Sequence, residues 1–471
     1  MRRSSAHARP ARPRQPSPAD HVWGDESDAV LRAISWATGR VVRSSDPKST
    51  ARGADDLTRA AGRTITPQGM GAEAALRVFT EVLEPATRAQ DDPLNLAYIP
   101  AAPTRAAIAF DLVTSSANIF GGLWEAGAGA IWAENQALGW LAGLLGWGWR
   151  PAAASSPGAP SGTSPRSRRR GTAPCSAGVA ARGWLAGGLL GRRPPSVSAA
   201  ARVLDVEVVD VPVDDGGHLT GAALRATITA PERLFAVVAS AGTTNAGIID
   251  DLGGIADFCD EHGIWLHVDG AYGGAGLASP RLRPQYAGIE RAHSFIVDPH
   301  KWLFAPYDCC ALLYRDAADG AAAHAQHASY LDQVDRAAAN PSDLAIHLSR
   351  RARGLPFWFS LATHGTERYA AAIDRTVDTA RQVAETIDAT PFLRLLQAPE
   401  LTVLLFDRPG WSPEACRRWS DDLAKSGVML CVPTSWQGAP VLRLAFVNPD
   451  TDPDVVGEIL VTTMAADDYP G

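Results

Sequence analysis

The chain has 471 residues, of which 46% are apolar and 20% charged, enough material for two or three domains with apolar cores. These fractions exclude a small disulfide-stabilised scaffold, a fibrous chain and a chain that is disordered throughout. Lys and Arg number 44 against 51 Asp and Glu, for a formal charge of -7. Because such a balance attracts neither nucleic acid nor an anionic membrane, we expect neither as a partner.

The cysteines and the first residues indicate a cytoplasmic protein. Among six cysteines only Cys309 and Cys310 are adjacent and no CxxC pair occurs, a pattern typical of reduced thiols rather than of disulfides or a metal site. Residues 1–24 contain Arg and Pro but no apolar run of a signal peptide, so we expect a disordered tail. No run is long and apolar enough to predict a membrane span.

Residues 25–105 are predicted to form an N-terminal helical segment. Leu76, Phe79 and Leu83 recur at the three- and four-residue spacing of one helix face, and Pro85 follows as a stop signal.

From residue 106 to 350 the pattern predicts a large domain with a mostly parallel sheet. A helix is predicted over residues 251–263, where Leu252, Ile255 and Cys259 share one face and Gly263 ends it. A strand lies on each side of this helix, which makes a strand–helix–strand unit. The short apolar runs predicted as strands are 203–211, 234–240, 264–269, 294–297 and 310–314.

Residues 351–471 are predicted to form a small C-terminal α/β domain. A long helix should carry its apolar stripe from Tyr369 to Ile387, followed by strands in 400–408 and 440–447 and a closing helix.

One segment disagrees with its surroundings. Residues 151–196 contain no Asp or Glu, and 31 of these 46 residues are Gly, Ala, Ser or Pro. That composition is typical of a linker or a disordered insert, which is unexpected inside a compact domain.

The stretch from Ser240 to Trp302 carries the chemistry. Asp269 ends a predicted buried strand, at the sheet edge where α/β proteins bind ligands, and Lys301 follows after a further strand. One interpretation is a plain buried Asp–Lys ion pair. The other is that Asp269 holds a protonated pyridine nitrogen while Lys301, its pKa lowered by desolvation, forms a Schiff base with a pyridoxal aldehyde.

At these residues the chain resembles the group II pyridoxal-phosphate-dependent amino-acid decarboxylases, such as the aromatic-L-amino-acid decarboxylases. HVDGAYGG (267–274) and DPHKW (298–302) resemble that family's HVDAAYAG and NPHKW blocks at the same separation, and the similarity extends from Leu76 to Thr463 except through 151–196. The resemblance implies the aspartate aminotransferase-like fold type I, with a seven-stranded large-domain sheet, and a homodimer with active sites at the interface.

Site residues are carried over by position. The resemblance implies that Lys301 binds pyridoxal 5'-phosphate (PLP) covalently and that Asp269 pairs with the pyridinium nitrogen, which makes the ring an electron sink. It further implies that Ala271 packs on the ring, that Thr244 reaches the ring 3-hydroxyl or the substrate carboxylate, and that His300 belongs to the cofactor site.

Tyr330 lies where the family's mobile loop carries a tyrosine that protonates the carbanion, and a tyrosine there resembles decarboxylases rather than aldehyde synthases, which have Phe. An ordinary surface tyrosine is the alternative. Ala101 stands where the family's substrate-pocket block has Thr, so the amino-acid substrate, aromatic or other, stays open. Arg443 and the pair Arg350–Arg351 match basic positions, but a salt-bridged or solvated arginine is the commoner explanation.

The family's phosphate-binding block, FVSGGT-x-GNL, and its ring-stacking His are missing; Pro194 stands where that His should be. The gene can also be read in another frame, in which each new codon takes the last nucleotide of one codon and the first two of the next. In that frame, synonymous codons that encode residues 155–172 can spell FVSGGTFGNLSALAAARH. We therefore hypothesise that 151–195 is translated out of frame between two compensating frameshifts; the alternative is a true insert.

The sequence therefore predicts a PLP-dependent carboxy-lyase that converts an L-amino acid into an amine. Two alternatives stay open: another PLP reaction on the same fold, and a catalytically impaired homologue that lacks the phosphate cradle.

Overall fold

The computed structural model describes residues 27–43, 51–148, 153–156, 184–189, 201–324, 340–345 and 347–465. Tyr330 and Pro194 lie outside these residues, as does the predicted N-terminal tail. Contacts divide the chain into two compact units, one of residues 1–43 and 51–87 and one of residues 44–50 and 88–471.

The described residues of the first unit form four helical elements; the N-terminal helical segment over 25–105 stays a prediction. Trp36 on its first helix meets Phe79 edge to ring, with centroids 5.2 Å apart. Phe79 and Leu83 lie on a π-helical turn and are about 40% exposed, so the apolar spacing that predicts their helix does not bury them in the described residues of this unit. Its elements are α1 (Ser27–Val42), α2 (Ala54–Ala61), α3 (Ala72–Val78) and η1 (Phe79–Leu83).

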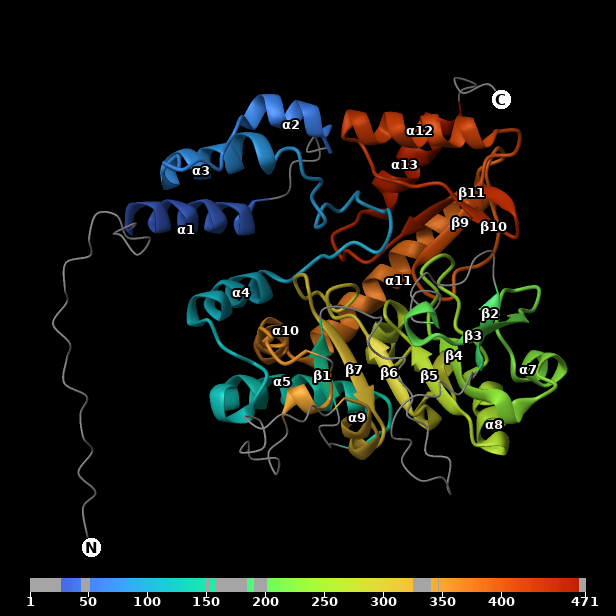
Figure 1. Cartoon of the computed structure of the whole chain (residues 1–471). Helices are drawn as coiled ribbons and strands as arrows, with labels where there is room; N and C mark the ends of the chain where they lie inside the picture. The colour runs from blue at the N-terminus through green and yellow to red at the C-terminus, as the bar shows by residue number, and fades with distance from the viewer. Residues whose placement is uncertain are drawn as a thin grey trace, which may run out of the picture. The chain divides into compact units, whose positions relative to one another are not determined.

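The second unit is built around a seven-stranded sheet in the order β1-β7-β6-β5-β4-β2-β3 (Figure 1). Strands β2 to β6 pair in parallel, whereas β7 pairs antiparallel with both β6 and β1. The predicted fold type I sheet, mostly parallel and of seven strands, is therefore confirmed. Its strands are β1 (Ala153–Ser156), β2 (Trp184–Leu189), β3 (Glu207–Pro212), β4 (Leu234–Ser240), β5 (Trp265–Asp269), β6 (Ser294–Val297) and β7 (Cys310–Tyr314).

Strands β1 and β2 lie inside the segment whose composition predicted a linker or a disordered insert. That prediction is wrong for these ten residues, because β2 pairs with both β3 and β4 and so occupies an interior position of the sheet. Removing an inserted segment should leave the sheet whole, whereas removing residues 151–195 would take out two of its strands. The topology thus favours altered residues of the fold over an added insert.

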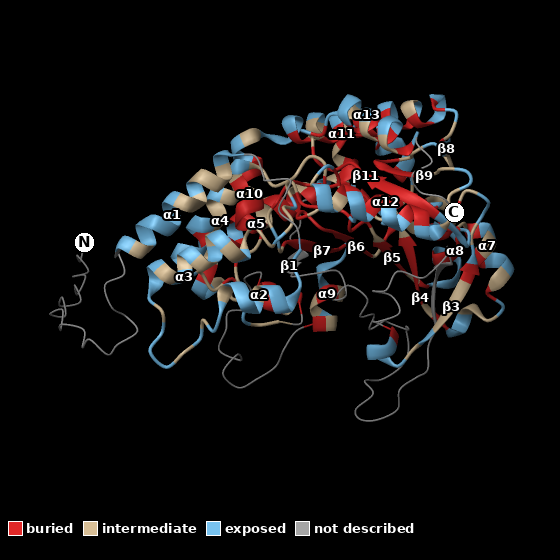
Figure 2. Cartoon of the chain, turned by 90° about the horizontal axis from the view of Figure 1, so that it is seen from above, coloured by how far each residue is buried: buried red, intermediate tan, exposed pale blue. Residues whose placement is uncertain are grey.

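The central strands are apolar because both their faces are covered. Every residue of β6 and β7 is buried, as expected for strands packed on both sides (Figure 2). The helix after β4 begins where the Asp251 side chain accepts a hydrogen bond from the Gly254 amide, and it ends at Gly263, whose φ of 64° is the left-handed conformation that glycine adopts readily. The helices of this part are α4 (Arg105–Ala117), α5 (Trp124–Leu144), α7 (Gly221–Thr227), α8 (Leu252–His262), α9 (Ala317–His324) and α10 (Leu355–His364).

A second sheet follows the long helix α11 (Thr366–Ala389), whose predicted stripe from Tyr369 to Ile387 is buried. Its strand order is β10-β11-β9-β8, all antiparallel. The proposed division into a large domain over 106–350 and a small domain over 351–471 stays a prediction. The remaining elements are β8 (Arg394–Leu395), β9 (Val403–Asp407), α12 (Pro413–Ser426), β10 (Thr434–Trp436), β11 (Ala439–Ala445) and α13 (Pro453–Met464).

Candidate active site

The candidate site lies at one edge of the main sheet, where the neighbouring parallel strands β4, β5 and β6 end. Backbone hydrogen bonds join the segments that follow them. The Ala241 amide donates to the Asp269 carbonyl (2.8 Å), and the Asp298 amide donates to the Ala271 carbonyl (3.0 Å). The carboxyl ends of parallel strands are the usual ligand-binding edge of such sheets.

Asp269 is the last residue of β5. One carboxylate oxygen accepts a hydrogen bond from the Ala271 amide (3.0 Å), which holds the side chain at the strand end. His267, two residues earlier, is buried, and its Nδ1 lies 2.8 Å from the Ser294 hydroxyl. Burial lowers the pKa of His267 to about 4, only partly opposed by Asp269, so this imidazole is neutral beside the carboxylate at pH 7.

Lys301 makes a different ion pair from the predicted one. Its Nζ lies 2.8 Å from Oδ2 of Asp298, whereas Asp269 interacts with it only at longer range. The predicted lowering of the lysine pKa is also wrong. Burial does oppose the charge, but the contact with Asp298 outweighs it and raises the pKa of Lys301 above its usual value.

His300 and Ala271 lie close to these carboxylates. His300 is 9% exposed, its Nδ1 lies 2.7 Å from the Cys309 carbonyl oxygen, and its Nε2 lies 3.8 Å from Asp298. Burial lowers the pKa of His300, which keeps the ring neutral at pH 7. Ala271 is buried, and its backbone links the ends of β5 and β6.

Thr244 lies after β4, with its side chain exposed. Its carbonyl oxygen accepts two hydrogen bonds from the Arg443 guanidinium, at 3.0 Å from Nε and 2.5 Å from Nη2. Arg443 is 6% exposed, and burial lowers its pKa to about 10. The expectation of a solvated or salt-bridged arginine is therefore wrong for Arg443, because the described contacts of its guanidinium go to a carbonyl.

That expectation holds for the other two arginines. Arg350 pairs with Glu134 (2.9 Å) in the interior, and Arg351 pairs with Asp111 (2.7 Å). Arg350 is thereby paired with a residue of α5 and Arg351 with a residue of α4.

Sequence reasoning missed Asp298. The signal was present, since DPHKW carries an aspartate where the resembled block has asparagine, three residues before the lysine. Tyr307 was also missed. Its ring lies 5.0 Å from that of His300 between centroids, and it is half exposed beside the site.

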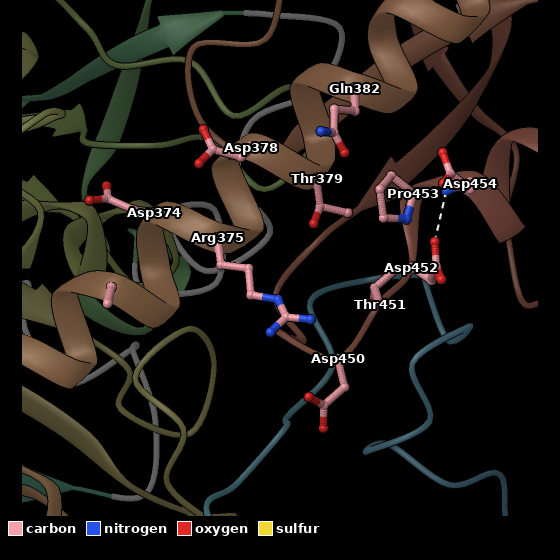
Figure 3. Close-up of a pocket in the computed structure, with 11 residues that line it drawn as sticks. Asp374, Arg375, Asp378, Thr379, Gln382, Asp450, Thr451, Asp452, Pro453 and Asp454 are labelled. Atoms are coloured by element: carbon pink, nitrogen blue, oxygen red, sulfur yellow. Dashed lines mark hydrogen bonds between the residues drawn. The ribbon is translucent and has the colours of Figure 1, made fainter.

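A cavity of about 640 Å³ lies elsewhere, between α11 and the start of α13 (Figure 3). Its walls include none of the predicted site residues, and carboxylates dominate them, with the Arg375 side chain among them. Such walls do not suit an anionic ligand. The lining carboxylates belong to Asp374, Asp378, Asp450, Asp452 and Asp454.

The residues at the strand edge fit PLP. Asp269 supplies a fixed carboxylate for a ring nitrogen, Lys301 supplies the amine, and Oδ1 of Asp298 is a buried oxygen without a hydrogen-bond partner in the described structure. Most of the residues that stand in place of the family's phosphate-binding block, 157–164, lie outside the described residues.

Residues 193–408 match the pyridoxal-dependent decarboxylase conserved domain, so the match begins within the last residues of the acid-free segment. The aromatic-L-amino-acid decarboxylase of Bacillus atrophaeus is 27% identical over 397 residues, which cover 80% of this chain and 81% of that protein. The L-2,4-diaminobutyrate decarboxylase of Rhizobium meliloti (strain 1021) is 34% identical over 265 residues, 54% and 53% of the two chains. The crystal structure of Oryza sativa TDC with PLP and tryptamine aligns with a TM-score of 0.85 at 21% identity, over 96% of this chain and 99% of that one.

Proposed function

Because this chain belongs to the pyridoxal-dependent decarboxylase family, we propose that it is a PLP-dependent carboxy-lyase that releases carbon dioxide from an L-amino acid. The observation that carries the proposal is the joint position of Asp269 and Lys301 at one edge of a fold type I sheet. PLP, when bound, supplies an electron sink for the carbanion left by carbon dioxide.

The chain's own residues would then act as follows. Lys301 provides the amine that binds the cofactor covalently, and Asp269 holds a proton on the ring nitrogen. Ala271 packs on the ring, Thr244 and His300 line the site, and Tyr330 donates the final proton; these six roles are proposals from the resemblance. That the amino-acid substrate is aromatic is likewise a proposal. One relative above is named for aromatic amino acids and the other for L-2,4-diaminobutyrate.

A homodimer and a cytoplasmic location are part of the proposal. Large apolar side chains on α4 and α5 are half exposed, notably Leu112, Val113 and Trp132, as expected where a second copy packs. The five described cysteines are all free and buried, which suits a reducing compartment. No helix in the described ranges has both the length and the apolar character needed to cross a bilayer. Light scattering on the purified protein tests the dimer: a monomer mass would refute it.

A second candidate is a catalytically impaired homologue. It is favoured by two sequence features: the family match starts only at residue 193, so the position of the phosphate loop falls in unmatched sequence, and Pro194 stands where the ring-stacking His is expected. Loss of this cradle weakens cofactor binding while leaving Lys301 and Asp269 in place.

The test is titration of the purified chain with PLP, followed by borohydride reduction and peptide mapping. The chain has three lysines, Lys48, Lys301 and Lys425, so the modified position is unambiguous. Label confined to Lys301, lost in Lys301→Ala, with carbon dioxide released from an amino acid, supports decarboxylation. Label on Lys301 without turnover supports the impaired homologue. No label on Lys301 refutes PLP binding by this chain, and the gene with residues 151–195 restored to the family frame is the matched comparison.

A further inference from the structure

The Lys301 amine is held by a carboxylate that the family resemblance does not assign. Asp298 is 3% exposed and follows β6 directly. Its amide donates to the Ala271 carbonyl (3.0 Å), and its carbonyl accepts from the Lys301 amide (2.9 Å). With its backbone fixed at both ends, the carboxylate is placed with little freedom, and its Oδ2 lies 2.8 Å from Nζ of Lys301.

The other groups that act on Lys301 are more distant or uncharged. Asp269 from β5 and the Cys310 thiol from β7 favour its charge at longer range. The His300 ring is neutral because burial lowers its pKa, and the Tyr307 phenol, whose pKa burial raises, stays protonated at pH 7. Asp298 is therefore the charged group in direct contact with the lysine among the described residues.

The contact is also unusual in what it leaves unsatisfied. Oδ1 of Asp298 is buried and has no hydrogen-bond partner in the described part of the chain. A buried carboxylate oxygen without a donor is costly, and structural ion pairs normally satisfy both oxygens. One carboxylate oxygen contacts Lys301, and the other has no donor among the described residues.

We propose that Asp298 is a positioning residue for Lys301, whose carboxylate holds the lysine nitrogen, and the positive charge on it, at the sheet edge where Asp269 stands. This role rests on the proposed function, because the lysine nitrogen that Asp298 holds is the one that would bind PLP. The contact itself exists without any cofactor, so it can be tested separately.

The test measures Lys301 reactivity in the purified chain without added cofactor. Brief pulses of acetic anhydride are applied between pH 7 and 10.5, and acetylation at each lysine is quantified by mass spectrometry. We expect Asp298→Asn to lower the pH midpoint of Lys301 acetylation and to speed it about tenfold or more at pH 8.5, since an adjacent opposite charge shifts a pKa by ~1–3. Exposed Lys425 is the internal reference and should not change.

Asp308→Asn is the matched control. Asp308 lies in the same segment and forms an ion pair of 3.0 Å, but with Arg353, so its loss should leave the Lys301 midpoint unchanged. A midpoint unmoved by Asp298→Asn, or moved equally by Asp308→Asn, would overturn the proposal.

Two further outcomes remain decisive. If Asp298→Asn does not fold by circular dichroism, the unaltered protein answers the question: a Lys301 midpoint above that of Lys425 supports the proposal, and one at or below it refutes it. Failure of Lys301 to capture PLP in the borohydride experiment would refute the proposed function and leave this inference standing, because the acetylation profile needs no cofactor.

Discussion

Gly270, directly after Asp269, has no room for a methyl group. A Cβ there would lie 2.5 Å from Cε2 and 2.8 Å from Cζ of Phe295, a buried residue of β6, and 3.1 Å from Cα of Gly274. Carbon atoms in good contact are ~3.5–4.0 Å apart, so the overlap approaches 1 Å. We expect Gly270→Ala to destabilise the protein by about 1–3 kcal/mol, the usual range for overpacking a core. Where the backbone permits it, Gly→Ala normally stabilises by ~0.4–1 kcal/mol, so the predicted sign is opposite.

The assay is urea unfolding followed by fluorescence, read as the transition midpoint and slope. Phe295→Leu removes the ring atoms that clash, and alone should cost less than ~1.5 kcal/mol. Combined with Gly270→Ala it should recover ~0.5–3 kcal/mol relative to the sum of the single changes. Gly273→Ala is the control: its Cβ meets the Ala241 carbonyl oxygen, so Phe295→Leu should not rescue it. A Gly270→Ala protein as stable as the parent, or no coupling to Phe295, would refute this reasoning.

Two further predictions concern the Trp302–Thr376 hydrogen bond and the contacts of His218. The Trp302 side chain is fully buried, and its indole N–H donates to the Thr376 hydroxyl at 2.8 Å. Thr376→Val removes this acceptor and should destabilise the protein by about 1–3 kcal/mol in the same assay. A variant as stable as the parent would contradict this prediction. His218 should contribute to stability in a pH-dependent way: burial opposes its charge, but hydrogen bonds to Asp214 and Glu400 (2.9 and 2.6 Å) prevail and raise its pKa. Its contribution is thus full below pH 6.5 and lost as pH rises through the raised folded-state pKa. Urea midpoints at pH 6 and 8.5 should differ less for His218→Gln than for the parent; an identical pH dependence would exclude the ion pairs.

The sequence predicted the sheet well because its central strands are buried on both faces. Strands β4, β6 and β7 match the predicted runs at both ends, since a strand covered on both sides needs uninterrupted apolar residues and is recognisable alone. The HVDGAYGG and DPHKW blocks located the candidate site because the first contains the end of β5 and the second follows β6, and these neighbouring parallel strands end at one edge. Composition misled in 151–196, because strand pairing uses backbone groups that any residue but proline provides, so the small residues of β2 still pair on both sides.

Partner choice among charged side chains was decided only by the tertiary structure. Lys301 has Asp269 and Asp298 within electrostatic range. The sequence analysis paired it with Asp269 and missed Asp298, which the turn after β6 brings to 2.8 Å. The sequence predicts a solvated or salt-bridged Arg443. In the structure this residue of β11 is buried, and its guanidinium donates to the Thr244 carbonyl, 199 residues away in the chain. Hydrophobic periodicity is a local property of the sequence and predicts the strands, whereas the pairing of charges depends on distances that exist only once those strands have packed.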